Sequence, residues 1–183
     1  MLDQQRDYVL RTVEERGVRL IRLWFTDVLG NLKSFAISPA ELENALEDGM
    51  TFDGSAIDGF SRVQEADVLA MPDPNTFEVL PWGDPKSVEA RVFCDIHNLD
   101  GSPFEGDPRQ VLRRQIARLA ERGWALQTGI EPEFFLLQRT ASGFAPADAH
   151  DRLDKPSYDL KSLPRQREFL HELATGLQAC GLH

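Results

Sequence analysis

The first half of the chain combines two kinds of hydrophobic pattern, which predicts a mixture of helices and strands. Apolar residues of segment 3–16 fall on one helical stripe among charged residues, and Gly17 is placed to end that helix. Residues 18–26 and 32–38 are rich in β-formers and are separated by a turn containing Gly-Asn, which predicts a β-hairpin. Pro39 and the acidic residues after it are typical of the start of a second helix.

The pattern then loses its period over residues 51–61, which we interpret as a structured loop. Strand-like runs return at three places, each separated by turn-forming residues: 68–71, 76–82 and 88–96. The first hundred residues therefore predict an α+β unit, a sheet with helices on one side. The sequence Asp-Gly-Ser-Pro near residue 100 marks the expected domain boundary, which we place near residue 105.

Beyond that boundary the pattern predicts fewer elements. Residues 108–123 form a strongly amphipathic helix with Asp107 as its N-cap, and residues 165–179 predict a final helix. Residues 124–138 are interpreted as a strand, and residues 140–154 as a loop.

Composition narrows the classes of function. The chain has 183 residues, enough for one or two domains, and 20 basic against 30 acidic residues give a net charge of −10. This charge disfavours nucleic acid or an anionic membrane as the main partner. The two cysteines are too few for a disulfide framework, so we expect a reducing, cytoplasmic setting. From the sequence we expect neither an export signal nor a membrane-spanning segment.

The segment Gly-Ile-Glu-Pro-Glu-Phe-Phe-Leu-Leu at 129–137 carries candidate chemistry. In a strand, Glu131 and Glu133 share one face, about 7 Å apart, and the apolar run after them predicts that the strand enters a buried core. Two carboxylates so placed repel each other, and a divalent cation would relieve the repulsion. Oxygen ligands suit Mg²⁺ or Mn²⁺. The alternative is a pair of solvated glutamates on an edge strand.

A second candidate is the segment Phe-Asp-Gly-Ser-Ala-Ile-Asp-Gly-Phe at 52–60. Its two glycines permit tight turns that can present the Asp53 carboxylate. It matches neither a phosphate-binding P-loop nor a dinucleotide-binding fingerprint. An ordinary surface loop is the alternative.

Four motifs in order resemble the glutamine synthetase family, specifically the bacterial type I enzymes. They are the two candidate segments, 52–60 and 131–136, together with Leu-Trp-Phe-Thr-Asp-Val-Leu-Gly at 23–30 and Met-Pro-Asp-Pro at 71–74. The resemblance implies an N-terminal β-grasp domain over 1–104, followed by the truncated start of the catalytic α/β domain over 105–183.

The resemblance also implies roles for individual residues. Glu131 and Glu133 correspond to ligands of the catalytic Mg²⁺ or Mn²⁺ ions. Asp53 corresponds to the residue that reaches into a neighbouring subunit's site and binds the incoming ammonium. Phe60 corresponds to an aromatic position near the nucleotide. The expected assembly is a dodecamer of stacked hexamers.

The implied reaction joins an amine to the γ-carboxylate of glutamate through γ-glutamyl phosphate, with ATP as co-substrate. Members that use ammonia usually have a second serine where this chain has Ala56. Ammonia and a larger amine, such as a polyamine or ethanolamine, therefore both remain open as acceptors.

The family's remaining ligands and nucleotide-binding arginines would lie beyond His183, so we expect this chain alone to be inactive. A fragment of a longer enzyme is the leading interpretation. The alternative is a non-catalytic β-grasp module that acts through assembly or regulation.

Overall fold

The computed structural model describes residues 2–54, 67–150 and 158–182. The chain forms two compact units, one made of Met1–Leu126 with Ala179–Gly181 and the other of Gln127–Gln178 with Leu182–His183. Each unit is described by itself. Among the described residues, no helix is long and apolar enough to cross a membrane.

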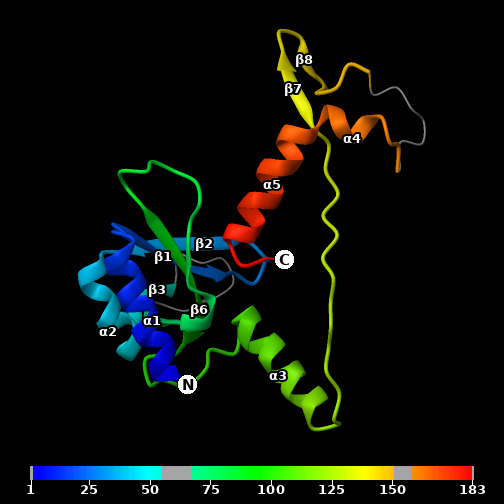
Figure 1. The fold of residues 1–183 in the computed structure, drawn as a ribbon. Coiled ribbons are helices and arrows are strands. Elements are labelled where there is room, and N and C mark those ends of the chain that lie inside the picture. The colour runs from blue at the N-terminus through cyan, green and yellow to red at the C-terminus, as the bar shows by residue number, and fades with distance from the viewer. Residues whose placement is uncertain (1, 55–66, 151–157, 183) are drawn as a thin grey trace. The chain divides into compact units, whose positions relative to one another are not determined.

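The first unit is built on a mixed sheet whose main strands lie in the order β2-β1-β6-β4-β3 (Figure 1). The short strand β5 pairs with β6 beside this path. Strands β1 and β6 are parallel neighbours, with Leu23 opposite Val92, and the other pairs are antiparallel. The strands are β1 (Leu20–Thr26), β2 (Leu32–Ile37), β3 (Met50–Asp53), β4 (Asp67–Pro72), β5 (Glu78–Val79) and β6 (Glu89–His97).

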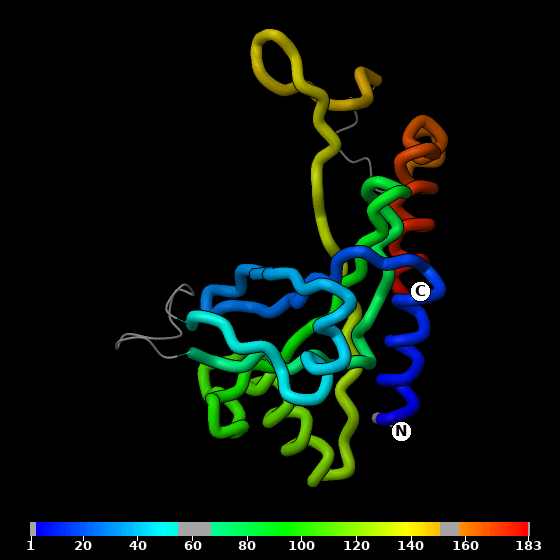
Figure 2. Tube along the Cα trace, turned by 90° about the vertical axis from the view of Figure 1, so that its left-hand side faces the viewer, coloured from blue at the N-terminus to red at the C-terminus, as the bar shows by residue number. Residues whose placement is uncertain are grey.

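Two helices cover one face of this sheet (Figures 1 and 2). They are α1 (Leu2–Glu15) and α2 (Leu42–Asp48), the latter entered through the short 3-10 turn η1 (Pro39–Glu41). The core forms between them and the strands because alternate strand residues are fully buried. Its members include Val9 and Val13 of α1, Leu42 and Ala45 of α2, and Ile21, Leu23, Val92 and Ile96 of the central strands. The predicted α+β unit is confirmed.

Gly49 shows why α2 ends where it does. Its φ of 75° lies in the left-handed region, and a Cβ there would come within 2.4 Å of the Met71 sulfur and 3.2 Å of the Ala70 carbonyl oxygen. Only glycine therefore allows β3 to begin immediately after α2.

Two sequence predictions in this unit need correction. The loop predicted over 51–61 begins as an edge strand, because residues 50–53 pair with β4. The strand predicted over 76–82 shrinks to the two residues of β5, since the 3-10 turn η3 (Pro74–Thr76) occupies its start.

The helix predicted over 108–123 is confirmed as α3 (Pro108–Ala120), with Asp107 as its N-cap. It belongs to the first unit, and the compact units divide at 126/127. The 104/105 domain boundary drawn from the sequence stays a prediction.

The second unit contains the hairpin β7 (Leu137–Thr140) and β8 (Gly143–Pro146), followed by helices α4 (Ser162–Arg165) and α5 (Arg167–Ala179). The helix predicted over 165–179 is therefore confirmed. The strand predicted over 124–138 is wrong for most of its length, because regular pairing begins only at Leu137. The loop predicted over 140–154 is also wrong in part, since it contains β8.

Candidate functional site

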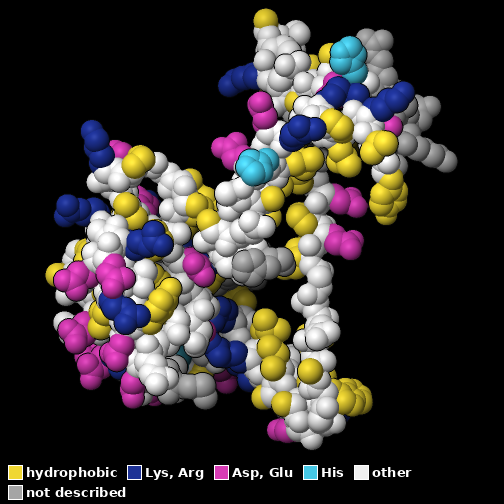
Figure 3. All heavy atoms as spheres, viewed as in Figure 1, with side chains coloured by type: hydrophobic (Ala, Val, Ile, Leu, Met, Phe, Trp, Pro, Cys, Tyr) yellow, Lys and Arg dark blue, Asp and Glu magenta, His cyan; other side chains and the backbone are white. Residues whose placement is uncertain are grey.

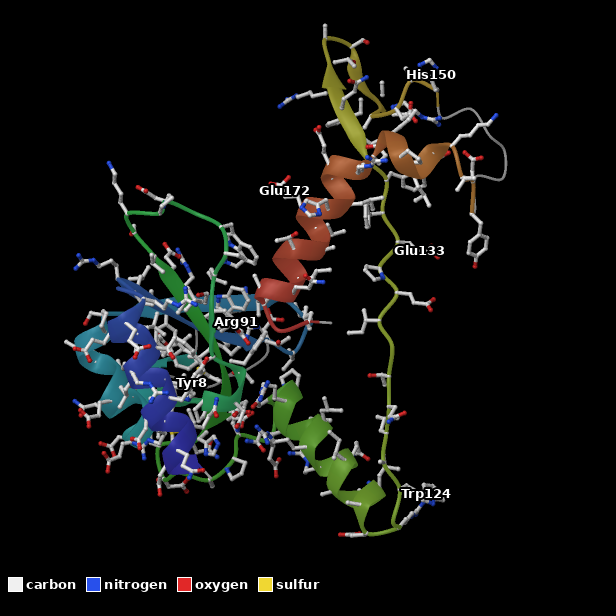
Figure 4. The ribbon with its side chains drawn as sticks, viewed as in Figure 1. Tyr8, Arg91, Trp124, Glu133, His150 and Glu172 are labelled. Atoms are coloured by element: carbon white, nitrogen blue, oxygen red, sulfur yellow. The ribbon has the colours of Figure 1, made fainter. Side chains whose placement is uncertain are left out.

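The two candidate metal ligands lie on the segment that leads into β7. Residues 127–136 have no regular secondary structure and run as an extended stretch of chain, on which Figure 4 labels Glu133. Both Glu131 and Glu133 are exposed. On extended backbone the i, i+2 spacing would put the two carboxylates on one side of the chain, and this shared face stays a prediction.

The surroundings of this pair differ from the sequence prediction. The apolar residues beside the glutamates do not enter a buried core: Ile130 is 89% exposed and Phe135 is 91% exposed. Phe134 makes an edge-to-face contact with Phe169 of α5, with ring centroids 5.8 Å apart. An apolar run builds a buried strand only where other strands flank it, and here pairing begins only at Leu137, the last residue of the run.

The chemistry of these donors fits a hard divalent cation. Carboxylate oxygens are the ligands that Mg²⁺ and Mn²⁺ prefer, and Mg²⁺ commonly keeps several waters beside one or two protein carboxylates. In the described part of the chain, no group of three or more acidic, histidine or cysteine side chains could hold a metal ion. Glu131 and Glu133 would therefore contribute only part of a coordination sphere.

Asp53 ends the edge strand β3, directly opposite Asp67 on β4. It is exposed, whereas the next residue, Gly54, is buried. The segment 52–60 is thus held at its start by the sheet. Ala56 and Phe60 lie outside the described residues, so the predicted nucleotide contact of Phe60 stays a prediction.

Asp53 belongs to the first unit and the glutamate pair to the second. The structure describes the backbone that carries each candidate, and their roles in binding ammonium and metal stay predictions.

The sequence did not reveal the structural role of Asp27, which lies in the motif at 23–30. Its side chain is fully buried, its Oδ1 accepts hydrogen bonds from the N–H groups of Leu29 and Asn31, and its Oδ2 lies 3.6 Å from the Lys33 ammonium. Burial acts to raise the pKa of Asp27, but these hydrogen bonds and the lysine lower it overall. The Asp-x-x-Gly spacing before the second strand is the signal for such a turn.

Asp107 is also fully buried and binds two elements at once. Besides capping α3 through the N–H of Arg109, it accepts a hydrogen bond from the N–H of Ile96 in β6. Burial raises the pKa of Asp107, although both backbone hydrogen bonds act in the opposite direction. The N-cap was visible in the sequence, but the link to β6 was not.

Comparison with known proteins places these features in a class. The family model of the glutamine synthetase β-grasp domain matches residues 17–99, and the model of the glutamine synthetase catalytic domain matches residues 105–183.

Curated relatives are similar over most of the chain. It is 53% identical to a glutamine synthetase of Mycolicibacterium smegmatis over 152 residues, which are 82% of this chain and 34% of that protein. It is 57% identical to one of Mycobacterium tuberculosis over 139 residues, 75% of this chain and 31% of that protein. A glutamine synthetase of Thermus thermophilus is 42% identical over 177 residues, 94% of this chain and 39% of that protein. The chain thus spans about a third of the length of these relatives.

Two solved structures are similar to this chain in fold. A structure titled as a GmaS/ADP complex matches with a TM-score of 0.74 and 25% identity, covering 94% of this chain and 39% of that one. A structure of GmaS without ligand matches with a TM-score of 0.71 at 24% identity, which supports the fold alone.

The fold and the matched models therefore define a β-grasp domain that continues into the first part of a catalytic domain. The chain belongs to the glutamine synthetase family.

Proposed function

We propose that the full-length protein carrying this chain is an ATP-dependent ligase that joins an amine to the γ-carboxylate of glutamate. One observation carries the proposal: two domain models of one family match the chain in the family's order. The names of the curated relatives favour ammonia as the acceptor. The ADP complex named in a related structure supports an adenine nucleotide as co-substrate. We place the enzyme in the cytoplasm and expect a cyclic oligomer.

In this proposal Glu131 and Glu133 hold a divalent cation between them. Their two carboxylates supply a local negative charge, and their oxygen atoms match a hard cation. The bound Mg²⁺ or Mn²⁺ would supply neutralisation of the charge that gathers when phosphate passes from ATP to the glutamate carboxylate. The exposure of both side chains leaves them accessible to such a cation.

Asp53 is proposed to bind the ammonium ion that becomes the acceptor. Near neutral pH ammonia is mostly protonated, so an anionic group must attract the cation and help to remove its proton before attack. Asp53 stands at the end of β3, where the edge strand holds its backbone and leaves the side chain exposed. In the family this residue serves a neighbouring subunit, which is why we propose a ring in which adjacent subunits share sites.

The next question is which amine serves as the acceptor. Ala56 offers no hydroxyl where ammonia-using members usually have serine, so a bulkier amine is the second candidate acceptor. The decisive experiment incubates the full-length protein with ATP, Mg²⁺, glutamate and one amine at a time, and identifies each product by mass. We expect γ-glutamyl products with ammonia. Products with a polyamine or ethanolamine alone would reassign the acceptor, and no γ-glutamyl product with any amine would overturn the ligase proposal.

The alternative of a non-catalytic β-grasp module is not favoured, because the catalytic-domain model matches everything after residue 104.

A further inference from the structure

Four charged residues outside the candidate site form a closed cluster. The arginines come from α3 and the acids from the sheet side: Asp73 follows β4 and Asp95 lies on β6. Arg109 contacts the Asp73 carboxylate at 2.9 Å and the Asp95 carboxylate at 2.8 Å. Arg113 contacts the same two carboxylates at 2.9 and 2.8 Å. Each arginine therefore bridges both acids, and each acid is shared by both arginines.

The cluster joins the two parts of the chain that the family models separate. Asp73 and Asp95 lie within the β-grasp match, whereas Arg109 and Arg113 lie within the catalytic-domain match. The side chains of the two acids are only 16% and 14% exposed, so water and salt screen these pairs less than ordinary surface pairs. The cluster is thus a charged joint at a domain junction.

The helix turns its charged side to the sheet and leaves its apolar side uncovered. Arg109 and Arg113 are one turn apart and so share a face. Arg109 also lies over the ring of Phe93, 5.8 Å from its centroid. By contrast Leu112 and Ile116 are 53% and 48% exposed, and Figure 3 shows apolar side chains along this helix. Apolar packing therefore contributes little to holding α3 against the strands.

Geometry makes such a joint specific in orientation. Apolar contacts tolerate sliding, but a guanidinium group that bridges two carboxylates fixes direction as well as distance. Two acids that lie this close to the same guanidinium groups would repel each other without them.

We infer that Arg109 and Arg113 are positioning residues that fix the first helix of the catalytic domain on the β-grasp sheet by clamping Asp73 and Asp95. The inference concerns how the two domains are joined and does not rest on the proposed ligase reaction.

Amide hydrogen exchange in the full-length protein tests this joint. Asp95→Asn and Arg113→Gln should each speed exchange of the amides of α3 by about tenfold and leave the amides of β1 and β6 unchanged. The double variant should be faster than either single variant but by less than the product of their two effects, because both changes remove the shared Arg113–Asp95 pair. Exchange of the α3 amides in Arg109→Lys should be faster than in the native protein and slower than in Arg109→Gln. The lysine keeps the positive charge, but its ammonium group lacks the planar array of donors that lets a guanidinium group bridge two carboxylates.

Arg118→Gln is the matched control, because Arg118 is an exposed arginine of the same helix that makes no ion pair with any described residue. It should leave exchange in α3 at the native rate. If a variant fails to fold, rising salt applied to the native protein gives a second test and should speed exchange in α3 more than in β6. Native exchange in α3 in every variant, additive effects in the double variant, or equal acceleration in β6 would overturn the inference.

Discussion

One carboxylate, that of Asp107, ties the backbone of Ile96 in β6 to the start of α3. Its Oδ2 accepts a hydrogen bond from the Ile96 N–H at 2.9 Å, while its Oδ1 accepts one from the Arg109 N–H at 3.0 Å. The two oxygens therefore serve two different elements. This buried link lies beside the arginine cluster and fixes the same junction.

The two-oxygen link predicts that asparagine cannot replace Asp107, although asparagine is ordinarily a good N-cap. Asn has one acceptor oxygen, so Asp107→Asn must leave one buried N–H without its partner, at a cost of about 1 to 3 kcal/mol. Urea unfolding of the full-length protein should measure this loss.

Asp100→Asn is the matched control for that variant. Asp100 is exposed and uses only Oδ1 to accept both hydrogen bonds from Ser102, so asparagine can keep them. We expect near-native stability. Equal losses in the two variants would contradict the role given to the second oxygen of Asp107.

The lowered pKa of Asp27 predicts that the free energy of unfolding depends on pH. Its folded pKa lies below its ordinary value of 3.8, so the carboxylate stabilises the fold above that value. This contribution is lost as the pH falls through the lowered folded pKa. Asp27→Asn keeps an oxygen for the Leu29 and Asn31 N–H groups but cannot titrate.

The native protein should therefore lose its stability advantage over Asp27→Asn on acidification below 3.8. Unfolding free energies of both proteins, measured at a series of acidic pH values, provide the comparison. A difference that stays constant or grows toward acid would contradict the lowered pKa.

Glu131→Gln and Glu133→Gln should each weaken binding of Mn²⁺ by tenfold or more, because each removes one charged ligand. Titration of the full-length protein with Mn²⁺, followed by electron paramagnetic resonance, measures free and bound ion directly. Glu121→Gln is the control, since Glu121 is an exposed glutamate ten residues before Glu131. Native affinity in both variants would show that the pair is merely solvated.

Asp53→Asn should raise the KM for ammonium by at least about tenfold while leaving the KM for ATP near native, because only the cation depends on this negative charge. Asp67→Asn is the matched control, an exposed acid directly opposite on the neighbouring strand. If Asp67→Asn raises the KM for ammonium equally, the effect comes from the combined negative charge of the two acids and not from Asp53 itself.

Much of the first unit could be predicted from local pattern. The hairpin β1–β2 and helices α1 and α3 carry their signals within a few residues: alternation, a turn and caps. The parallel pairing of β1 with β6 could not be predicted, because its partners lie far apart in the chain. The edge strand β3 was hidden by the glycines after it.

The candidate site was accessible to sequence reasoning in its residues but not in its surroundings. Glu131 and Glu133 were identified by spacing and by the family motif. The burial of the segment around them was predicted wrongly, because an apolar run such as 134–137 reports a preference for an interior and not the presence of one. Likewise, the charges of Asp95 and Arg113 gave no sign that they meet.

The central claim is tested most directly by phosphate release from ATP by the full-length protein with Mg²⁺ present. The account predicts release that requires glutamate and ammonia or another amine together and that is lost in Glu131→Gln. Phosphate release that proceeds at the same rate without glutamate, or that Glu131→Gln leaves unchanged, would contradict it.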